Sequence, residues 1–114
     1  MKIGSFQPLA LKKEILSVRK KGFTIKENLL SIKFLKKTEN KVAFIIKKKI
    51  GIAVERNKIK NQIRSIIRAT QLFNENCIHC MIKIHDDSIK KTPFQNIRQE
   101  VELMFLKCYK KIKG

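Results

Sequence analysis

The most informative stretch of this chain is Lys48-Lys49-Ile50-Gly51-Ile52-Ala53-Val54-Glu55-Arg56-Asn57-Lys58-Ile59-Lys60-Asn61-Gln62-Ile63-Arg64, which continues to Arg68. Its cations recur every four residues, and in an α-helix this spacing turns by only about 40° per step, so the cations form one slanting line. We call this line the basic stripe; its members are Arg56, Lys60, Arg64 and Arg68. A second, apolar line runs through Ile59, Ile63, Ile66 and Ile67. The stretch therefore predicts a helix from about residue 53 to residue 72 that packs on a sheet and keeps its cations in water.

The chain as a whole is strongly basic. Its 27 Lys and Arg residues outnumber its 9 Asp and Glu residues, which gives a formal net charge of +18 at pH 7. Charges of one sign repel one another and destabilise the compact state, so a bound polyanion should stabilise the protein. Arg side chains bind phosphate oxygens in two-pronged geometry, and the amides of Asn57 and Asn61 can add hydrogen bonds to ribose or to base edges. We therefore expect the helix to bind RNA with an affinity that falls steeply as salt rises.

Size and composition exclude several classes of protein. The 114 residues suit a single RNA-binding domain over residues 1–114. The longest apolar run is Val42–Ile46, whereas a membrane helix needs roughly 20 apolar residues and a signal peptide roughly 7–15. Three cysteines cannot all pair within one chain, and reduced thiols favour the cytoplasm. We expect a soluble cytoplasmic protein with no membrane contact and no obligate protein partner.

Hydrophobic periodicity predicts the order of the elements. The apolar residues between Leu9 and Lys20 follow helical spacing, and Gly22 can end that helix in a left-handed cap. Between Ile25 and Lys37 apolar and polar residues alternate, which predicts a strand. We expect an irregular arm over residues 1–8, a helix over 9–20, a hairpin of strands over 25–37 and 41–48, the basic helix, a buried strand over 77–84 and a last helix over 94–109. This order predicts an α+β fold, a small two-layer α/β sandwich of one sheet with helices packed on it.

Two other groups of residues could form a metal or catalytic site, but their patterns are more typical of core or solvent-exposed positions. Cys77, His79 and Cys80, with His85 nearby, suggest a zinc site or a protein-only enzyme, yet the paired ligand spacing of zinc sites is missing. A strand would also point Cys77 and Cys80 to opposite faces, so we expect core cysteines and a surface histidine. The pair Asp86-Asp87 lacks a third ligand or a base, so it predicts a turn with solvated charges instead of a nuclease site.

The opening stretch resembles the signature of the bacterial ribonuclease P protein component. In that family a K-[KR]-x-G-x-A-V-x-R-N-[RK]-x-[KR] run opens a long basic helix. The matching residues here are Lys48-Lys49-Ile50-Gly51-x-Ala53-Val54-x-Arg56-Asn57-Lys58-Ile59-Lys60, followed by Ile63-Arg64. Length, charge and the order of elements agree as well, so the resemblance covers nearly the whole chain. The chain departs from residues common in the family at Ile52, Lys58 and Asn61.

The resemblance implies a fold and a function. The fold is the family's α/β sandwich, with a left-handed crossover near the central helix. The function is that of the protein subunit of ribonuclease P, whose catalytic RNA removes the 5′ leader from precursor tRNA. The reaction uses Mg²⁺ bound mainly by the RNA, and the protein supplies no catalytic group and binds no cofactor tightly. The RNA-binding residues are then Lys48, Lys49, Arg56, Asn57, Lys58, Lys60, Asn61, Arg64 and Arg68.

The resemblance also implies a cleft between the first helix and the sheet that holds the leader of precursor tRNA. Its expected lining is Ile15, Arg19, Leu30, Ile32 and Phe34. Ile15 and Arg19 stand where family members often have aromatic residues, and Arg19 can contact phosphate or stack through its planar head. The alternative is a structural RNA-binding protein of ribosomal type with no enzyme association, which shares the charge and size but not the run from Gly51 to Arg64.

Overall fold

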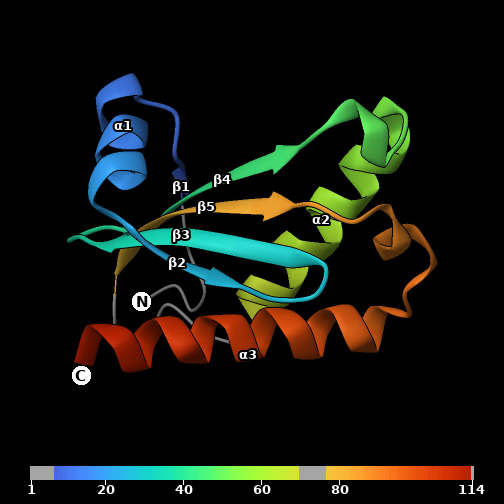
Figure 1. Ribbon diagram of the computed structural model, residues 1–114. Helices are drawn as coiled ribbons and strands as arrows, with labels where there is room; N and C mark the ends of the chain where they lie inside the picture. The colour runs from blue at the N-terminus through green and yellow to red at the C-terminus, as the bar shows by residue number, and fades with distance from the viewer. Residues whose placement is uncertain (1–6, 70–76, 114) are drawn as a thin grey trace.

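A mixed sheet forms the centre of the protein (Figure 1). The structure is a computed structural model that describes residues 7–69 and 77–113. The strands, in the spatial order β1-β4-β5-β3-β2, are β1 (Gln7–Pro8), β2 (Phe23–Lys26), β3 (Leu30–Lys36), β4 (Lys41–Ile46) and β5 (Ile78–Ile84). The helices are α1 (Lys12–Lys21), α2 (Ala53–Ala69) and α3 (Phe94–Lys113), with short 3₁₀ turns η1 (Lys48–Ile50) and η2 (Asp87–Lys91). None of the helices in the described ranges combines the length and the apolar composition that a membrane crossing needs.

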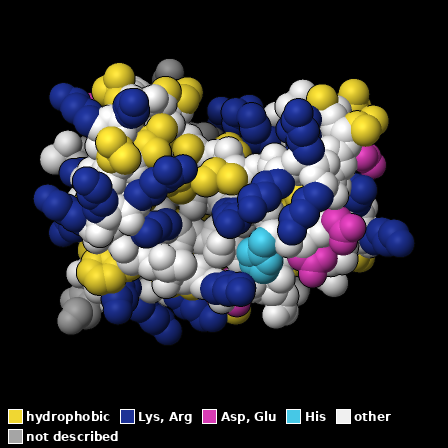
Figure 2. Space-filling view, turned by 45° about the horizontal axis from the view of Figure 1, so that its top comes forward, with side chains coloured by type: hydrophobic (Ala, Val, Ile, Leu, Met, Phe, Trp, Pro, Cys, Tyr) yellow, Lys and Arg dark blue, Asp and Glu magenta, His cyan; other side chains and the backbone are white. Residues whose placement is uncertain are grey.

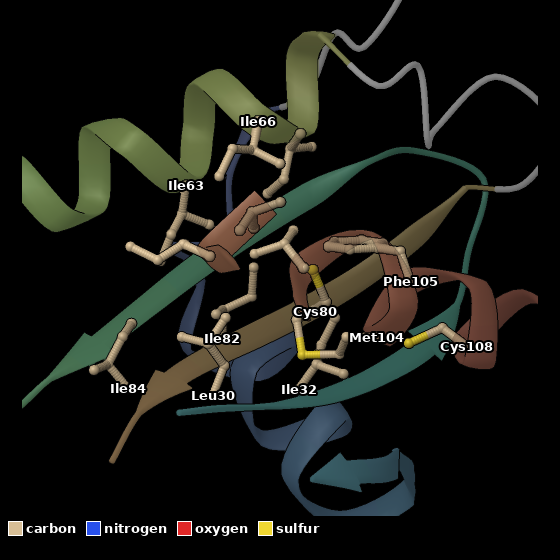
Figure 3. Packing of buried hydrophobic residues seen from close by; sticks show 14 of the residues in the cluster. Leu30, Ile32, Ile63, Ile66, Cys80, Ile82, Ile84, Met104, Phe105 and Cys108 are labelled. Carbon is tan, nitrogen blue, oxygen red and sulfur yellow. The ribbon is translucent and has the colours of Figure 1, made fainter. Parts of the chain in front are cut away.

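The two faces of the sheet are covered differently. Figure 1 shows α1 on one side of the sheet and α3 on the other. The main core lies between the sheet, α2 and α3, and the isoleucines of α2 point there toward side chains of β3, β5 and α3 (Figure 3). A smaller cluster of Leu9, Val18 and Met81 joins α1 to the opposite face. The predicted α+β sandwich is therefore confirmed, with a helix on the second face as well.

The strand pairing differs from the predicted hairpin of residues 25–37 with 41–48. β3 pairs antiparallel with β2 and with β5, and β4 pairs parallel with β5, so β5 lies between β3 and β4. The turn after β3 bonds to the start of β5: Ile78 N donates to Asn40 Oδ1 at 3.1 Å, and Lys37 N donates to Cys77 O at 3.0 Å. The sequence correctly predicted a polar turn after β3. Its hydrogen bonds go to the start of β5, however, and do not close a hairpin between β3 and β4. α2 joins the parallel strands β4 and β5, the connection for which the resemblance implies a left-handed sense.

Three local predictions are corrected as well. Residues 25–37 are not one strand, because β2 turns back at Glu27 to form β3, and Glu27 N donates to Leu30 O at 2.8 Å. Gln7–Pro8 is a short strand parallel to β4, so these two residues are not irregular; residues 1–6 of the expected arm, and the expected end of the basic helix at 70–72, lie outside the described residues. Gly22 is extended, with φ −73°, and not left-handed. A glycine is needed there for space, because a Cβ would meet Val18 O and lie 2.9 Å from Phe34 O.

Candidate nucleic-acid interface

The start of α2 is organised by the turn that precedes it. Ile50 is fully buried, so it anchors η1, while Lys48 and Lys49 are exposed on the same turn. At the helix start Ile52 N donates to Glu55 Oε1 at 3.0 Å, which satisfies one of the donors that a helix N-terminus leaves unpaired. The predicted Lys48 and Lys49 therefore lie on a fixed turn at the head of the basic helix.

The basic stripe slants across α2 from the edge of the core to its outer side. The four predicted isoleucines are buried and define the core side of the helix. Arg56, Lys60 and Arg64 are half-buried, whereas Arg68 is exposed. This gradient follows from the turn of about 40° per four residues, which carries each successive cation farther from the isoleucines. The prediction that these cations share one helix is confirmed, and none of them is buried.

The stripe borders an apolar edge of the sheet. The guanidinium carbon of Arg64 lies 5.5 Å from the ring centroid of Phe44 on β4. A small cavity of about 260 Å³ lies next to it, between Phe44, Ile46, Arg56 and Lys60. An aromatic ring beneath a guanidinium group holds its plane while leaving the N–H groups at its rim for an anion. This edge can therefore orient cations toward phosphates.

The other predicted residues of α2 lie next to the basic stripe. Asn57 also lines the cavity beside Arg56 and Lys60, and Asn61 Oδ1 accepts a hydrogen bond from Arg64 Nη1 at 3.4 Å. Asn57, Lys58 and Asn61 are all exposed. They line a groove of about 740 Å³ between α2 and Phe94, the first residue of α3. The sequence predicted these three residues but gave no reason to connect them with Phe94.

A second basic surface is a cleft on the face of the sheet that α1 partly covers. Its volume is about 480 Å³. Figure 2 shows this face, with Lys and Arg side chains on both sides of a hollow and hydrophobic side chains between them. The side chains that line it are Arg19 of α1, Thr24 of β2, Ser31 and Lys33 of β3, Ile45 of β4, and Met81 and Lys83 of β5. The cleft thus offers cations and hydroxyl groups over an apolar floor, which suits a single nucleic-acid strand.

The predicted lining of this cleft was largely wrong. Leu30, Ile32 and Phe34 are 0%, 1% and 0% exposed and belong to the main core on the other face, although Ile32 borders the cleft from beneath. Side chains alternate between the two faces of a strand. Because residues 30, 32 and 34 face the main core, residues 31 and 33 face the cleft. Ile15 is half-buried and packs with the small cluster under α1, and Arg19 lines the cleft as expected.

Lys33 and Lys83 are the cleft cations that sequence reasoning missed. Each is half-buried, and each comes from one of two paired strands, β3 and β5. A signal for Lys83 was present in the sequence, because it is a lone charge in the apolar run of β5. For Lys33 the signal was its place between two core residues of an alternating strand.

A polar cluster fixes α1 beside the cleft. Lys41 Nζ donates to both carboxylate oxygens of Glu14, at 3.1 and 3.0 Å, and Glu14 Oε2 lies 4.0 Å from His79 Nε2. The Lys41 hydrogen bond lowers the pKa of Glu14 and raises that of Lys41. Burial lowers the pKa of His79, which is 5% exposed, so the expectation of a surface histidine was wrong. The cluster ties α1 to β4 and β5.

The alternative metal chemistry has no site in the part of the chain that the structure describes. No three His, Cys, Asp or Glu side chains of residues 7–69 and 77–113 are grouped to hold a metal ion. Cys80 lies in the main core, as does Cys108, whose pKa burial raises to about 12. Asp86 accepts a hydrogen bond from Ser88 N at 2.9 Å, which caps η2.

Comparison with known proteins gives the family. Residues 5–109 match the family model described as Ribonuclease P. The chain belongs to the ribonuclease P protein family. Family members are protein components of ribonuclease P, the ribonucleoprotein endoribonuclease of tRNA processing, and this match favours that role over the ribosomal-type alternative. Among relatives, the ribonuclease P protein component of Syntrophomonas wolfei is 32% identical over 90 residues, which cover 77% of this chain and 75% of the relative.

Solved structures of ribonuclease P proteins share the fold. The protein from Staphylococcus aureus superposes with a TM-score of 0.78 at 19% identity, over 93% of this chain and 97% of that one. The protein from Thermotoga maritima gives a TM-score of 0.76 at 19% identity, over 87% of this chain and 94% of that one. The arrangement of the sheet and the helices is therefore retained although most residues differ.

Proposed function

We propose that this ribonuclease P protein binds the catalytic RNA through α2 and holds the 5′ leader of precursor tRNA in the cleft beside α1. It would act in the cytoplasm, where the RNA-bound Mg²⁺ ions carry out cleavage of the leader. The protein itself would bind and position the two RNAs.

The observation that supports this proposal best is the placement of two cationic surfaces on opposite faces of one sheet. α2 carries the basic stripe on the core-covered side, and Lys33 and Lys83 line the cleft on the other side. A protein with this arrangement can contact two RNA segments at once and reduce the repulsion between their phosphates. Less Mg²⁺ is then needed to bring the segments together.

Reconstitution at low Mg²⁺ tests the proposal. The full chain is mixed with a bacterial ribonuclease P RNA, and cleavage of precursor tRNA is measured with and without protein. We expect clear stimulation by the protein, and less stimulation for a substrate whose leader is cut short. Cleavage at the rate of RNA alone would refute the proposed function.

A matched variant separates specific binding from charge alone. Alanine at Arg64 and Arg68 removes two cations of the basic stripe, whereas alanine at Lys20 and Lys91 removes two exposed cations elsewhere. We expect only the first variant to lose stimulation, because its cations contact the catalytic RNA. An equal loss in both variants would assign the effect to net charge and not to α2.

A further inference from the structure

The groove between α2 and Phe94 has a composition that phosphate binding does not explain. One wall carries side-chain amides and a hydroxyl group, from Asn57, Asn61, Gln62 and Ser65. The opposite wall is Phe94, which is 43% exposed although it is a large aromatic residue. Val54, at the end of the groove near the start of α2, is 73% exposed.

The groove and the first two cations of the basic stripe lie on different sides of the same helix, and the two surfaces meet at Asn57 and Asn61. Successive residues of a helix turn by about 100°, so the side that carries Asn61 and Ser65 is farther from β4 than the side that carries Arg56 and Lys60. Phe44 of β4 lines the cavity beside Arg56, and Phe94 of α3 lines the groove beside Asn61, while Asn57 borders both. α2 can therefore contact phosphates on one side and another chemical group on the other.

The residues of the groove match the chemistry of a nucleobase. A base has flat apolar faces, which stack on aromatic rings, and an edge of donors and acceptors, which amides pair with. A phosphate alone would leave Phe94 and Val54 without a partner. An apolar peptide would give the amides of Asn57 and Gln62 no hydrogen-bond partner, which costs free energy. Asn61 Oδ1 accepts a hydrogen bond from Arg64 Nη1 at 3.4 Å, and its NH₂ group can donate to a base. Lys58 lies in the same groove and can neutralise the phosphate attached to such a base.

We propose that this groove binds one unpaired nucleobase of the RNA partner, stacked on Phe94 and hydrogen-bonded along its edge by the amides of α2. The inference rests on the proposed function, since the base belongs to an RNA that the basic stripe already holds. The basic stripe contacts the RNA backbone, and this groove would add a contact to a base.

A tryptophan at position 94 reports stacking directly. The chain has no tryptophan, so Phe94→Trp gives a single emitter in the groove. We expect a single-stranded oligoadenylate of about 12 nucleotides to quench its fluorescence, and an abasic strand of the same length and charge to leave it unchanged. Leu103→Trp is the matched control, because Leu103 is 47% exposed on α3 and does not line the groove. Equal quenching by the abasic strand, or equal quenching at position 103, would overturn the proposal.

Affinity measurements on the full chain give a second test. Phe94→Ala should weaken oligoadenylate binding by about tenfold, within the range for loss of one stacked base, while Phe94→Tyr retains binding. Binding of the abasic strand and the salt slope should not change, because no cation is lost. Circular dichroism confirms that each variant is folded. Unchanged oligoadenylate affinity for Phe94→Ala would overturn the proposal.

These outcomes are independent of the test of the proposed function. If Phe94→Ala binds oligoadenylate like the parent while the parent stimulates cleavage at low Mg²⁺, the base site is refuted and the proposed function stands. If the parent does not stimulate cleavage, the proposed function is refuted whatever tryptophan quenching shows.

Discussion

Removal of the two cleft lysines should reduce affinity for the leader and leave affinity for the tRNA body intact. Lys33 lies opposite Met81 and Lys83 opposite Ser31 in the pairing of β3 with β5, so both lysines project from neighbouring strands into the cleft. Each is half-buried, so the stems pack on the sheet while the ammonium groups reach the cavity. The perturbation is the double variant with Lys33→Ala and Lys83→Ala.

The expected magnitude follows from the number of phosphates that the lysines can neutralise. For a single strand each neutralised phosphate contributes about −0.7 to the slope of log affinity against log salt. Two lost contacts should flatten the slope by about 1.4. Between about 1 M and about 0.15 M salt this change corresponds to a loss of roughly tenfold in affinity at the lower concentration.

The assay compares two substrates on the reconstituted holoenzyme over a series of salt concentrations. Precursor tRNA carries the leader and mature tRNA does not, so only precursor binding should weaken in the double variant. The control variant combines Lys91→Ala and Lys110→Ala, since both lysines are exposed and neither lines the cleft. It loses the same charge and should bind both substrates like the parent. An equal loss for mature tRNA, or an equal loss in the control, would refute the assignment of the cleft.

Three further predictions concern other parts of the molecule. Alanine at all four positions of the basic stripe should flatten the salt slope for ribonuclease P RNA by about 3 in filter binding, and an unchanged slope would contradict its role. Burial lowers the pKa of His79 in the folded state, so the unfolded chain binds a proton at this residue more readily. The contribution of neutral His79 to the free energy of unfolding is therefore fully present above about pH 6.5. It falls as the pH drops from there toward the lower folded pKa, by at most about 1.4 kcal/mol per pH unit. Urea midpoints at about pH 7.5 and about pH 5.5 should therefore differ less for His79→Gln than for the parent; an unchanged difference in that variant would disprove the reasoning. Gly22→Ala should cost about 1–3 kcal/mol, since its Cβ meets the backbone oxygens of Val18 and Phe34. Gly51→Ala should cost less, because its Cβ meets side-chain atoms of Glu55 and no backbone atom; equal urea midpoints for the two variants would show that space at Gly22 is not limiting.

Local patterns in the sequence predicted the types of the elements and the chemistry of the main helix. Period-3.6 spacing placed four isoleucines of α2 in the core, and the four-residue spacing of cations put the basic stripe on the same helix. Period-2 spacing put Val42, Phe44 and Ile46 on one side of β4, where they join the main core. These predictions succeed because they depend on the geometry of one helix or one strand, which neighbouring residues determine.

Which strands pair, and which helix covers which face of the sheet, depends on contacts between residues far apart in the chain. The insertion of β5 between β3 and β4 comes from hydrogen bonds such as that of Ile78 to Asn40, which no local pattern encodes. The periodicity of β3 showed that Leu30 and Phe34 face one way, but not that α2 and α3 occupy that side while α1 lies on the other. For this reason the sequence by itself determined a basic RNA-binding helix on a sheet, and only the tertiary structure decided that Lys33 and Lys83 line the cleft and that Phe94 faces the amides of α2.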